Sequence, residues 1–374
     1  MSNAQLSQGI RMKITIVAGA RPNFMKVAPI IRSIQAQQDA GVDIEYRLVH
    51  TGQHYDKKMS GDFFEQLNLP EPDANLGAGG GTQAEQTSAI MIGFEKELLE
   101  NRPDLVIVVG DVTSTMSCSI SAKKLHVDVA HVEGGIRSGD MSMPEEINRM
   151  VTDSITDLFF TTTHSAGDQL LKEGHSSEKI HFVGNTMIDT LHDRMSHLKK
   201  PSIVDEHRLK NGEFLVLTLH RPSNVDAEND LLNLLEKILE SSEDRPIVFP
   251  VHPRTAKVLG KAGFQNDRLI TTDPLGYLEF VYLLKNCQGV ITDSGGITEE
   301  ATVLGIPCIT LRTSTERPET VTIGTNELIG TNPEDVGPWI TKMLSGNWKK
   351  GGIPELWDGK TADRIVQVLL ERYE

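Results

Sequence analysis

The sequence predicts an α/β protein with two doubly wound parallel sheets. The chain has 374 residues, which at about 150 residues per domain is enough for two domains with a core each. Short β-branched segments recur with helix-length amphipathic segments between them, and this alternation is typical of a parallel sheet. The alternation breaks once, near residue 200, and then begins again. The chain is therefore expected to hold two similar halves.

The first half contains five expected strands that are apolar on both faces, as strands covered by helices on each side should be. They are KITIVA (13–18), YRLVH (46–50), DLVIVVG (104–110), VDVAHV (127–132) and LFFTT (158–162).

The second half repeats this pattern with five more expected strands. They are FLVLTLH (214–220), RPIVFPVH (245–252), RLITTD (268–273), GVITDS (289–294) and IPCITL (306–311). Helical spacing of apolar residues lies between them, at 230–241, 277–286 and 297–304.

The domain boundary is expected where polar residues, one proline and one glycine interrupt the periodicity, at 197–214. We predict a first domain over 12–198 and a second over 199–360. The last segment, 361–374, has apolar residues at helical spacing, and we expect this helix to pack back across the domain junction. Ligands of such folds bind at the carboxyl ends of the strands, so a cleft between the domains is the expected site.

The charge balance narrows the classes of ligand. With 37 Lys plus Arg against 52 Asp plus Glu, the formal charge is −15, which disfavours binding to nucleic acid or to an anionic membrane. No apolar run approaches the ~20 residues of a membrane span. The three cysteines are far apart in sequence and indicate buried thiols in a reducing cytoplasm. Residues 1–11 lack the apolar stretch of a signal peptide.

Basic residues follow the first expected strand. In GARPNFMK (19–26), Gly19 permits a tight turn, and Arg21 and Lys26 lie near a helix N-terminus that suits an anionic group. An ordinary strand-to-helix turn with solvated basic side chains is an equally good interpretation.

Acidic residues follow the third and fourth strands. Asp111 comes at a strand end, where it either faces the ligand or serves as a helix N-cap. Glu133 also ends a strand and is followed by two glycines, then by Glu145, Glu146 and Arg149. Glu145 and Arg149 are four residues apart, so they share a helix face and could pair. A loop that gathers so many acids favours a ligand or a proton transfer over a surface salt bridge.

Basic residues and glycines follow strands of the second half. His220 with Arg221, and His252 with Arg254, end successive strands and suit a phosphate group. In TDSGGITEEA (292–301), three consecutive residues at a helix start predict a diphosphate cradle: Ser294, Gly295 and Gly296.

Further candidates lie close to this cradle. Glu299 and Glu300 follow about one helical turn later, and at least one of them should receive neutral hydroxyls such as those of a ribose. Arg312 and Arg317 supply positive charge nearby, and Tyr277 or Phe280 is either a core residue or an aromatic that stacks on a base. No zinc spacing, P-loop or serine-nucleophile motif occurs. We therefore expect no metal and no serine-type nucleophile.

Nine motifs in order resemble the non-hydrolysing UDP-N-acetylglucosamine 2-epimerases, from about residue 13 to the C-terminus. They are GARPNFMK, TGQHYD, GDVTST, HVEGGIRSGD, MPEEINR, LHRPSN, PVHPR, DSGGITEEA and TERPE. The resemblance implies two Rossmann-like domains in the GT-B architecture. It also implies a cytoplasmic homodimer that interconverts UDP-GlcNAc and UDP-ManNAc for cell-surface polysaccharide, without metal or NAD.

The resemblance also implies roles for single residues. Asp111, Glu133 and Glu145 match the family's acid–base carboxylates, and His220 matches the histidine near the leaving diphosphate. The other matches bind substrate: Arg21, Lys26, Arg149, Phe280 at the uracil, Ser294, Gly295, Gly296, Glu300 at the ribose, and Arg317. His252 is added from its strand-end position alone.

The reaction chemistry agrees with several carboxylates. The C2 proton of an N-acetylhexosamine is not acidic, so its removal must accompany departure of UDP from C1, which gives a glycal. Return of a proton to the opposite face needs a second proton carrier. Two alternatives stay open: a hydrolysing 2-epimerase that releases ManNAc and UDP, and a 2-epimerase of a UDP-diacetamido-uronic acid.

Overall fold

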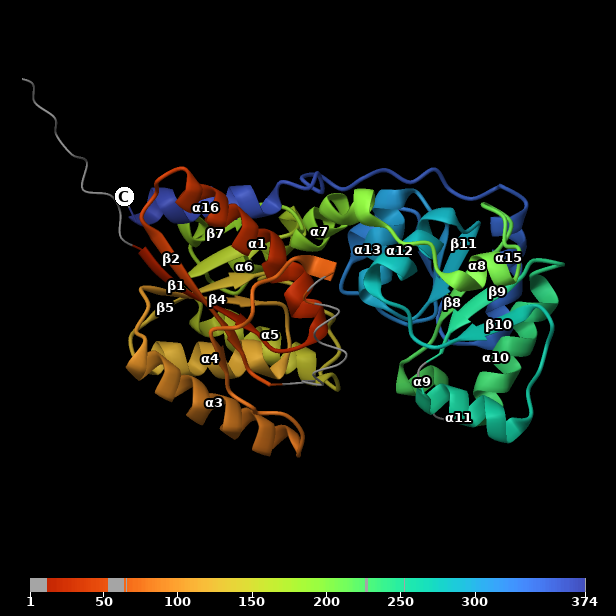
Figure 1. Ribbon diagram of the computed structural model, residues 1–374, viewed down its shortest axis with the longest axis horizontal. Coiled ribbons are helices and arrows are strands. Elements are labelled where there is room, and N and C mark those ends of the chain that lie inside the picture. Colours follow the sequence, from red (N-terminus) through yellow and green to blue (C-terminus); the bar gives the residue numbers. More distant parts are fainter. Residues whose placement is uncertain (1–11, 53–63, 65, 226–227, 252, 374) are drawn as a thin grey trace, which may run out of the picture. The chain divides into compact units, whose positions relative to one another are not determined.

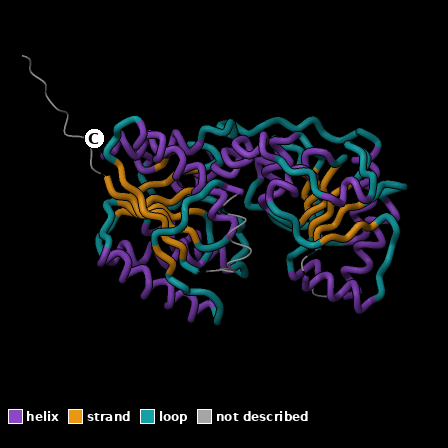
Figure 2. The backbone as a smooth tube through the Cα atoms, viewed as in Figure 1, coloured by secondary structure: helices purple, strands orange, loops and turns teal. Residues whose placement is uncertain are grey.

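The computed structural model describes residues 12–52, 64, 66–225, 228–251 and 253–373. The chain divides into two compact units, Met1–His192 with Glu355–Glu374, and Asp193–Pro354. Each unit is a sheet covered by helices (Figures 1 and 2). The predicted fold class, two parallel-sheet α/β domains, is confirmed.

The first unit contains a seven-stranded sheet in the order β3-β2-β1-β4-β5-β6-β7, in which every pairing is parallel. Its strands are β1 (Met12–Ala18), β2 (Ile44–His50), β3 (Ala74–Asn75), β4 (Leu105–Val109), β5 (Asp128–Val132), β6 (Leu158–Thr161) and β7 (Ile180–Phe182). The five expected strands are all present. The sequence does not predict β3 or β7, because two or three residues carry no periodicity.

Helices cover both faces of this sheet. They are α1 (Arg21–Asp39), α3 (Gln83–Glu100), α4 (Thr113–Lys124), α5 (Pro144–Ile155), α6 (His164–Lys172), α7 (Thr186–Arg194) and α16 (Thr361–Tyr373). Local sequence sets their starts: Pro144 opens α5, and a reciprocal capping box between Thr82 and Glu85 opens α3, with bonds of 2.8 and 3.2 Å.

The C-terminal helix α16 packs on α1 within the first unit. Ser33 donates to Asp363 (2.8 Å), which joins the two helices. The buried carboxylate of Asp189 accepts the amides of Thr361 (3.1 Å) and Ala362 (2.7 Å) and so caps α16. The end of the chain thus returns to the sheet on which the chain began.

The second unit contains a six-stranded parallel sheet in the order β10-β9-β8-β11-β12-β13. Its strands are β8 (Leu215–Thr218), β9 (Ile247–Pro250), β10 (Leu269–Thr272), β11 (Gly289–Thr292), β12 (Cys308–Thr310) and β13 (Asn326–Leu328). The five expected strands are again present, and the short β13 is not predicted from the sequence.

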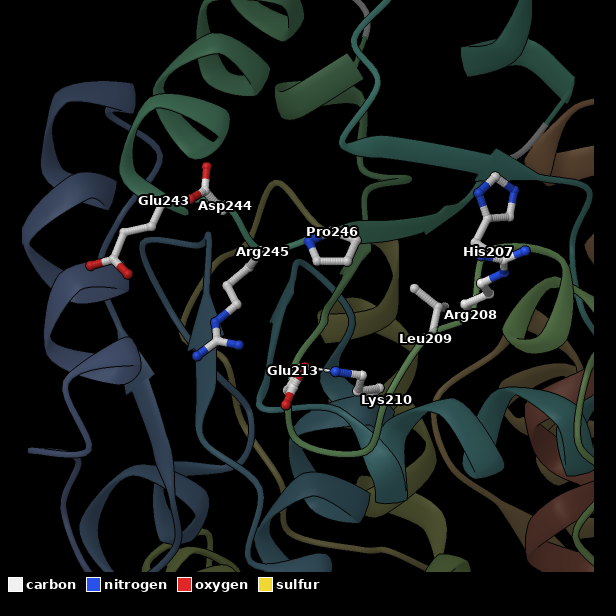
Figure 3. A pocket seen from close by; sticks show the side chains of 9 residues that line it. All are labelled: His207, Arg208, Leu209, Lys210, Glu213, Glu243, Asp244, Arg245 and Pro246. Carbon is white, nitrogen blue, oxygen red and sulfur yellow. Dashed lines mark ion pairs between the residues drawn. The ribbon is translucent and has the colours of Figure 1, made fainter.

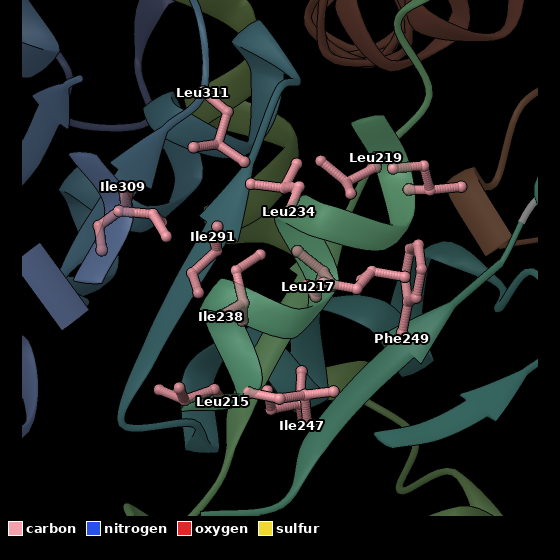
Figure 4. Close-up of a cluster of buried hydrophobic side chains, with 14 of the residues drawn as sticks. Leu215, Leu217, Leu219, Leu234, Ile238, Ile247, Phe249, Ile291, Ile309 and Leu311 are labelled. Carbon is pink, nitrogen blue, oxygen red and sulfur yellow. The ribbon is translucent and has the colours of Figure 1, made fainter. Parts of the chain in front are cut away.

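The helices of the second unit divide between the two faces of its sheet. They are α8 (Ser202–Glu206), α9 (Pro222–Val225), α10 (Glu228–Ser241), α11 (Pro253–Ala262), α12 (Tyr277–Asn286), α13 (Gly295–Leu304), α14 (Pro318–Thr322) and α15 (Val336–Leu344). On one face, Leu234 and Ile238 of α10 pack against Leu217 and Ile291 of the sheet (Figure 4). The opposite face is closed by apolar residues of α8, α12 and α13.

Candidate active site

Each sheet reverses its strand order at one point, and several candidate residues of each unit follow the two strands that meet there. In the first sheet, β1 lies beside β4, and in the second β8 lies beside β11. The loops that leave such adjacent strands diverge to opposite sides and form the ligand site of doubly wound folds. The sequence places Lys26 and Asp111 after β1 and β4, and it places His220 and Ser294 after β8 and β11.

A buried ion pair joins Lys26 and Glu133 in the first unit. Lys26 Nζ lies 2.7 Å from Glu133 Oε2, and the Glu133 side chain is only 4% exposed. Glu133 has a φ of +73°, a left-handed conformation that costs a non-glycine residue of the order of 1–3 kcal/mol. Gly110 also has a positive φ (+67°), and a Cβ there would lie 3.0 Å from Lys26 Nζ. The strained backbone of Glu133 thus holds its carboxylate against the ammonium group of Lys26.

Asn23 fixes the loop between β1 and α1. Its Oδ1 accepts the amides of Gly19 (3.1 Å) and Ala20 (3.0 Å), and its Nδ2 donates to the Val109 carbonyl (3.1 Å). The last bond joins the ends of β1 and β4. Sequence reasoning missed Asn23, although an asparagine in the first turn of a helix that starts with proline is a signal for capping.

Arg149 links Asp111 to Glu146. Its Nη2 donates to Asp111 Oδ2 (2.5 Å), and its Nη1 donates to Glu146 Oε2 (2.7 Å). The suggested Glu145–Arg149 pair is therefore wrong. Glu146 is the partner because the Ser138 and Gly139 amides (2.9 Å each) hold its carboxylate toward the loop.

These contacts leave the two carboxylates of α5 in different environments. Burial by itself raises the pKa of Glu146, but the two amides and the Arg149 guanidinium outweigh it and bring the pKa below its ordinary value. Glu145 is half-buried and forms no ion pair among the described residues. Glu146 is thus fixed as an ionised structural group, whereas Glu145 stays available to a ligand.

Asp293 organises the second unit's strand ends. Its fully buried carboxylate accepts the amides of His220 (3.0 Å) and Arg221 (2.9 Å), Asn224 Nδ2 (3.0 Å) and His220 Nδ1 (2.6 Å). Burial raises its pKa, but these partners, His220 foremost, lower it below the ordinary value. The His220 side chain is 56% exposed, so Asp293 orients an imidazole whose other edge meets solvent. The sequence does not single out Asp293, although it directly precedes Ser294 of the predicted cradle.

The predicted cradle lies at the start of α13. Ser294 is the N-cap, and the helix begins at Gly295. The first amides of a helix have no intrahelical acceptor and attract anions. The Ser294 amide differs from expectation, because it already donates to Thr292 Oγ1 (3.0 Å). The cradle is therefore made by the amides from Gly295 onward.

Two buried arginines flank the cradle, each paired with a glutamate. Arg312 Nη2 lies 2.8 Å from Glu316 Oε1, and a Cβ on Gly295 would lie 3.7 Å from Arg312 Nη1. Arg317 pairs with Glu299. Positive charge thus stands beside the helix N-terminus, and the acids hold it in place.

Glu300 is buried close to Glu299 and Tyr277. Burial, helped by the charge of Glu299, raises its pKa to about 7, against a smaller lowering by a hydrogen bond from Tyr277. Its Oε1 has no hydrogen-bond partner among the described residues. A ligand hydroxyl would satisfy this oxygen.

The remaining candidates stand apart from these contacts. Phe280 is partly buried against the apolar cluster on the face of α12 and α13. His252 and the side chain of Arg21 lie outside the described residues. Within the described part of the chain, no three His, Cys, Asp or Glu side chains gather as a metal site requires. No described helix is long and apolar enough to cross a bilayer.

A surface pocket of about 360 Å³ lies away from these residues, where segments 207–213 and 243–246 precede β8 and β9 (Figure 3). Charges of both signs line it, and Lys210 pairs with Glu213 at 3.5 Å. It is at the amino ends of the strands, opposite the switch point.

Comparisons with known proteins agree with the motif set. A family described as UDP-N-acetylglucosamine 2-epimerase matches residues 35–370. The UDP-N-acetylglucosamine 2-epimerase of Methanocaldococcus jannaschii is 42% identical over 370 residues, which cover 96% of this chain and 99% of that protein. A crystal structure of a UDP-GlcNAc 2-epimerase from the same organism, in complex with UDP-GlcNAc and UDP, has a TM-score of 0.84 and covers 96% of this chain and 100% of its own.

One relative has a different sugar in its name. The UDP-2,3-diacetamido-2,3-dideoxy-D-glucuronate 2-epimerase of Pseudomonas aeruginosa is 40% identical over 322 residues, which cover 85% of this chain and 88% of that protein. The family resemblance predicted from the nine motifs is confirmed by the family match and by these full-length similarities. The chain belongs to the UDP-N-acetylglucosamine 2-epimerase family.

Proposed function

We propose that the chain interconverts UDP-GlcNAc and UDP-ManNAc by eliminating UDP and adding it back to a glycal. The observation that supports this most strongly is the division of chemistry between the two switch points. One carries carboxylates held by Lys26 and Arg149, and the other carries a helix N-terminus with buried arginines. Proton transfer and diphosphate departure need these two kinds of group.

In the elimination, a carboxylate removes the C2 proton while the C1–O bond breaks and its electron pair leaves with UDP. The new C1–C2 double bond gives the glycal. Amides of Gly295 and Gly296, with Arg317 and His220, stabilise the charge that develops on the departing diphosphate. A proton is then delivered to the opposite face of C2, and UDP returns to C1. Asp111, Glu133 and Glu145 are the proposed proton carriers.

The reaction is tested by proton NMR of UDP-GlcNAc with the protein in deuterated water. We expect deuterium at C2 and the appearance of UDP-ManNAc. Free ManNAc would instead indicate a hydrolysing enzyme, and an unchanged spectrum would contradict the proposal.

A second candidate substrate is a UDP-diacetamido-uronic acid, because the Pseudomonas aeruginosa relative is 40% identical to this chain. The same experiment with both sugars in competition decides between them. The proposal for UDP-GlcNAc requires the larger kcat/KM for that sugar.

The cradle predicts that UDP binding is sensitive to a side chain at Gly295. We expect Gly295→Val to weaken UDP binding at least tenfold, because a β-branched side chain would stand where the diphosphate approaches the amides. Among the described residues, the first added atom meets only Arg312 Nη1, at 3.7 Å, so the fold should tolerate it. Calorimetry with UDP measures the effect. The matched control is Gly260→Val, at a helical glycine of α11 where a Cβ meets no described atom within 4 Å. Equal affinities for the two variants would place the phosphates elsewhere.

We also propose that the protein is a cytoplasmic homodimer that supplies UDP-ManNAc for cell-surface polysaccharide. The free thiols Cys118, Cys287 and Cys308 suit a reducing compartment. On α3, Ile92 and Leu99 are 70% and 67% exposed and lie seven residues apart on one helix face. Such large exposed apolar side chains suit an interface between copies.

The dimer is tested on this face. We expect Ile92→Lys with Leu99→Lys to halve the mass that light scattering reports, with no loss of helical content. Asp168→Lys, an exposed charge reversal on α6 of the same unit and away from the α3 face, serves as the control. A double variant that keeps the wild-type mass would rule out α3 as the interface.

A further inference from the structure

The imidazole of His131, on β5, is fully buried and has an acceptor at each ring nitrogen. Its Nε2 lies 2.8 Å from the carbonyl oxygen of Gly110, and its Nδ1 lies 2.6 Å from Asp153 Oδ1 on α5. Neither the family resemblance nor the proton-transfer chemistry assigns a role to this residue.

Hydrogen-bond accounting fixes the protons on the ring. A carbonyl oxygen only accepts, so Nε2 must carry a proton. Asp153 Oδ2 accepts the Gly135 amide (3.0 Å) and Arg137 Nη1 (2.7 Å), as an ionised carboxylate does. Burial raises the pKa of Asp153, but the charges and hydrogen bonds of His131 and Arg137 outweigh it and bring the pKa below its ordinary value. An ionised Asp153 also only accepts, so Nδ1 carries a proton as well.

We propose that His131 carries a proton on each ring nitrogen, one for each of its two acceptors, and acts as a positioning residue that fixes the spacing between Asp111 and Glu133. The proposal rests on the proton-carrier roles proposed above for those two carboxylates. A neutral imidazole has one N–H and could hold only one of the two acceptors. The doubly protonated ring holds both at once.

The two bonds of His131 reach the two strand ends that carry these carboxylates. Gly110, whose carbonyl it holds, directly precedes Asp111 and has a φ of +67°. Asp153, its other partner, accepts the amide of Gly135, two residues after Glu133. Glu133 and Gly135 both have positive φ values, so this loop needs an external restraint to keep its conformation.

The charges around the ring balance. His131 and Arg137 are cations, Asp153 and Glu173 are anions, and Arg137 joins the two acids at 2.7 and 2.6 Å. A buried ion pair with all its hydrogen bonds made stabilises the native state little, but it specifies geometry strongly. That property suits a site in which a shift of about 1 Å lowers the rate by about 10²-fold.

The first test needs no activity. Nitrogen-15 NMR of the histidine rings, with His131 assigned by comparison with His131→Gln, reports the proton on each ring nitrogen. We expect both nitrogens of His131 to be protonated at neutral pH. One unprotonated nitrogen would overturn the proposal.

The second test changes the counter-ion. In Asp153→Asn the amide can donate to Nδ1, so the ring becomes neutral with its remaining proton on Nε2. We expect Nδ1 to shift to the unprotonated position and kcat to fall about 10²-fold, while KM and the dissociation constant for UDP change less than threefold. The proposed UDP cradle is built from residues of the second unit, so unchanged UDP binding would show that the second unit is intact.

The matched control is Glu173→Gln, which alters the exposed end of the same network and should keep kcat within threefold of the wild-type value. A wild-type kcat in Asp153→Asn would overturn the positioning role. If the wild-type protein fails to exchange the C2 proton, the proposed function fails, and the ring nitrogens still decide the charge of His131.

Discussion

Replacing Glu133 by glutamine is expected to lower the turnover of UDP-GlcNAc by about 10²–10⁴-fold, the usual contribution of a general acid or base. The amide has nearly the shape of the carboxylate, and its oxygen can still accept from Lys26 Nζ, which lies 2.7 Å from Oε2. It cannot take up a proton. The left-handed backbone of Glu133 is unaffected by a change at the end of the side chain. Turnover is measured by the NMR assay and UDP binding by calorimetry, and the UDP dissociation constant should stay unchanged.

Amide substitutions at Asp111 and Glu145 distinguish a loss of proton transfer from a loss of local structure. Asp111→Asn also weakens the bond from Arg149 (2.5 Å), whereas Glu145 forms no ion pair among the described residues. A loss of turnover in Glu145→Gln would therefore report chemistry alone. The control is Glu100→Gln, a 61% exposed carboxylate of α3 in the same unit. Near-normal turnover in all three amide variants would remove the acid–base assignment.

Sequence alone predicts the framework because parallel strands have a strong signal. Strands buried on both faces need continuous apolar runs, and β4 (Leu105–Val109) is buried at every position. The ends of these apolar runs predict where the strands end. The candidates Lys26, Asp111 and Ser294 are found because they come after strands β1, β4 and β11. The edge strands β3 and β7 have only two and three residues, which is too short for a hydrophobic pattern. They are strands because they pair with a neighbouring strand, and their own sequences do not show this pairing.

Partner choice at the site is harder to predict because it depends on contacts between distant residues. Arg149 has acids three and four residues earlier, and both spacings share a helix face. Loop amides that hold the Glu146 carboxylate decide between them. Asp293 and His220 are 73 residues apart, and no local pattern connects them. The types of charge at each strand end are thus predictable, and their pairing is not.

The second large effect is expected at Glu300, where one substitution should stabilise the protein and weaken UDP binding. Its folded-state pKa is about 7, against an ordinary value of 4.5. At a pH below 4.5 both the folded and the unfolded states hold the proton, and the residue does not affect stability. Between pH 4.5 and about 7 the unfolded state releases this proton while the folded state keeps it, so the free energy of unfolding falls across that range and levels off above it.

Glu300→Gln removes this penalty. We expect the variant and the wild-type protein to have similar unfolding free energies at pH 4, and the variant to be more stable at pH 8 by the order of 3 kcal/mol. Denaturant unfolding at both pH values measures the difference. Glu236→Gln, an exposed change on α10 of the same unit, should show no such divergence. A constant difference across the pH range would contradict the raised pKa of Glu300.

UDP binding by the same variant should move in the opposite direction. Ribose hydroxyls donate best to an ionised carboxylate, and Glu300 Oε1 has no hydrogen-bond partner among the described residues. A hydrogen bond to a charged group contributes about 1.5–3 kcal/mol, so Glu300→Gln should weaken UDP binding roughly 10–100-fold at pH 8. Wild-type affinity should increase between pH 6 and 8 as Glu300 ionises, whereas the affinity of the variant should show a flatter profile, which calorimetry across that range measures. If both proteins bind UDP equally at pH 8, the ribose does not contact Glu300, and the buried carboxylate is a structural cost with no ligand to offset it.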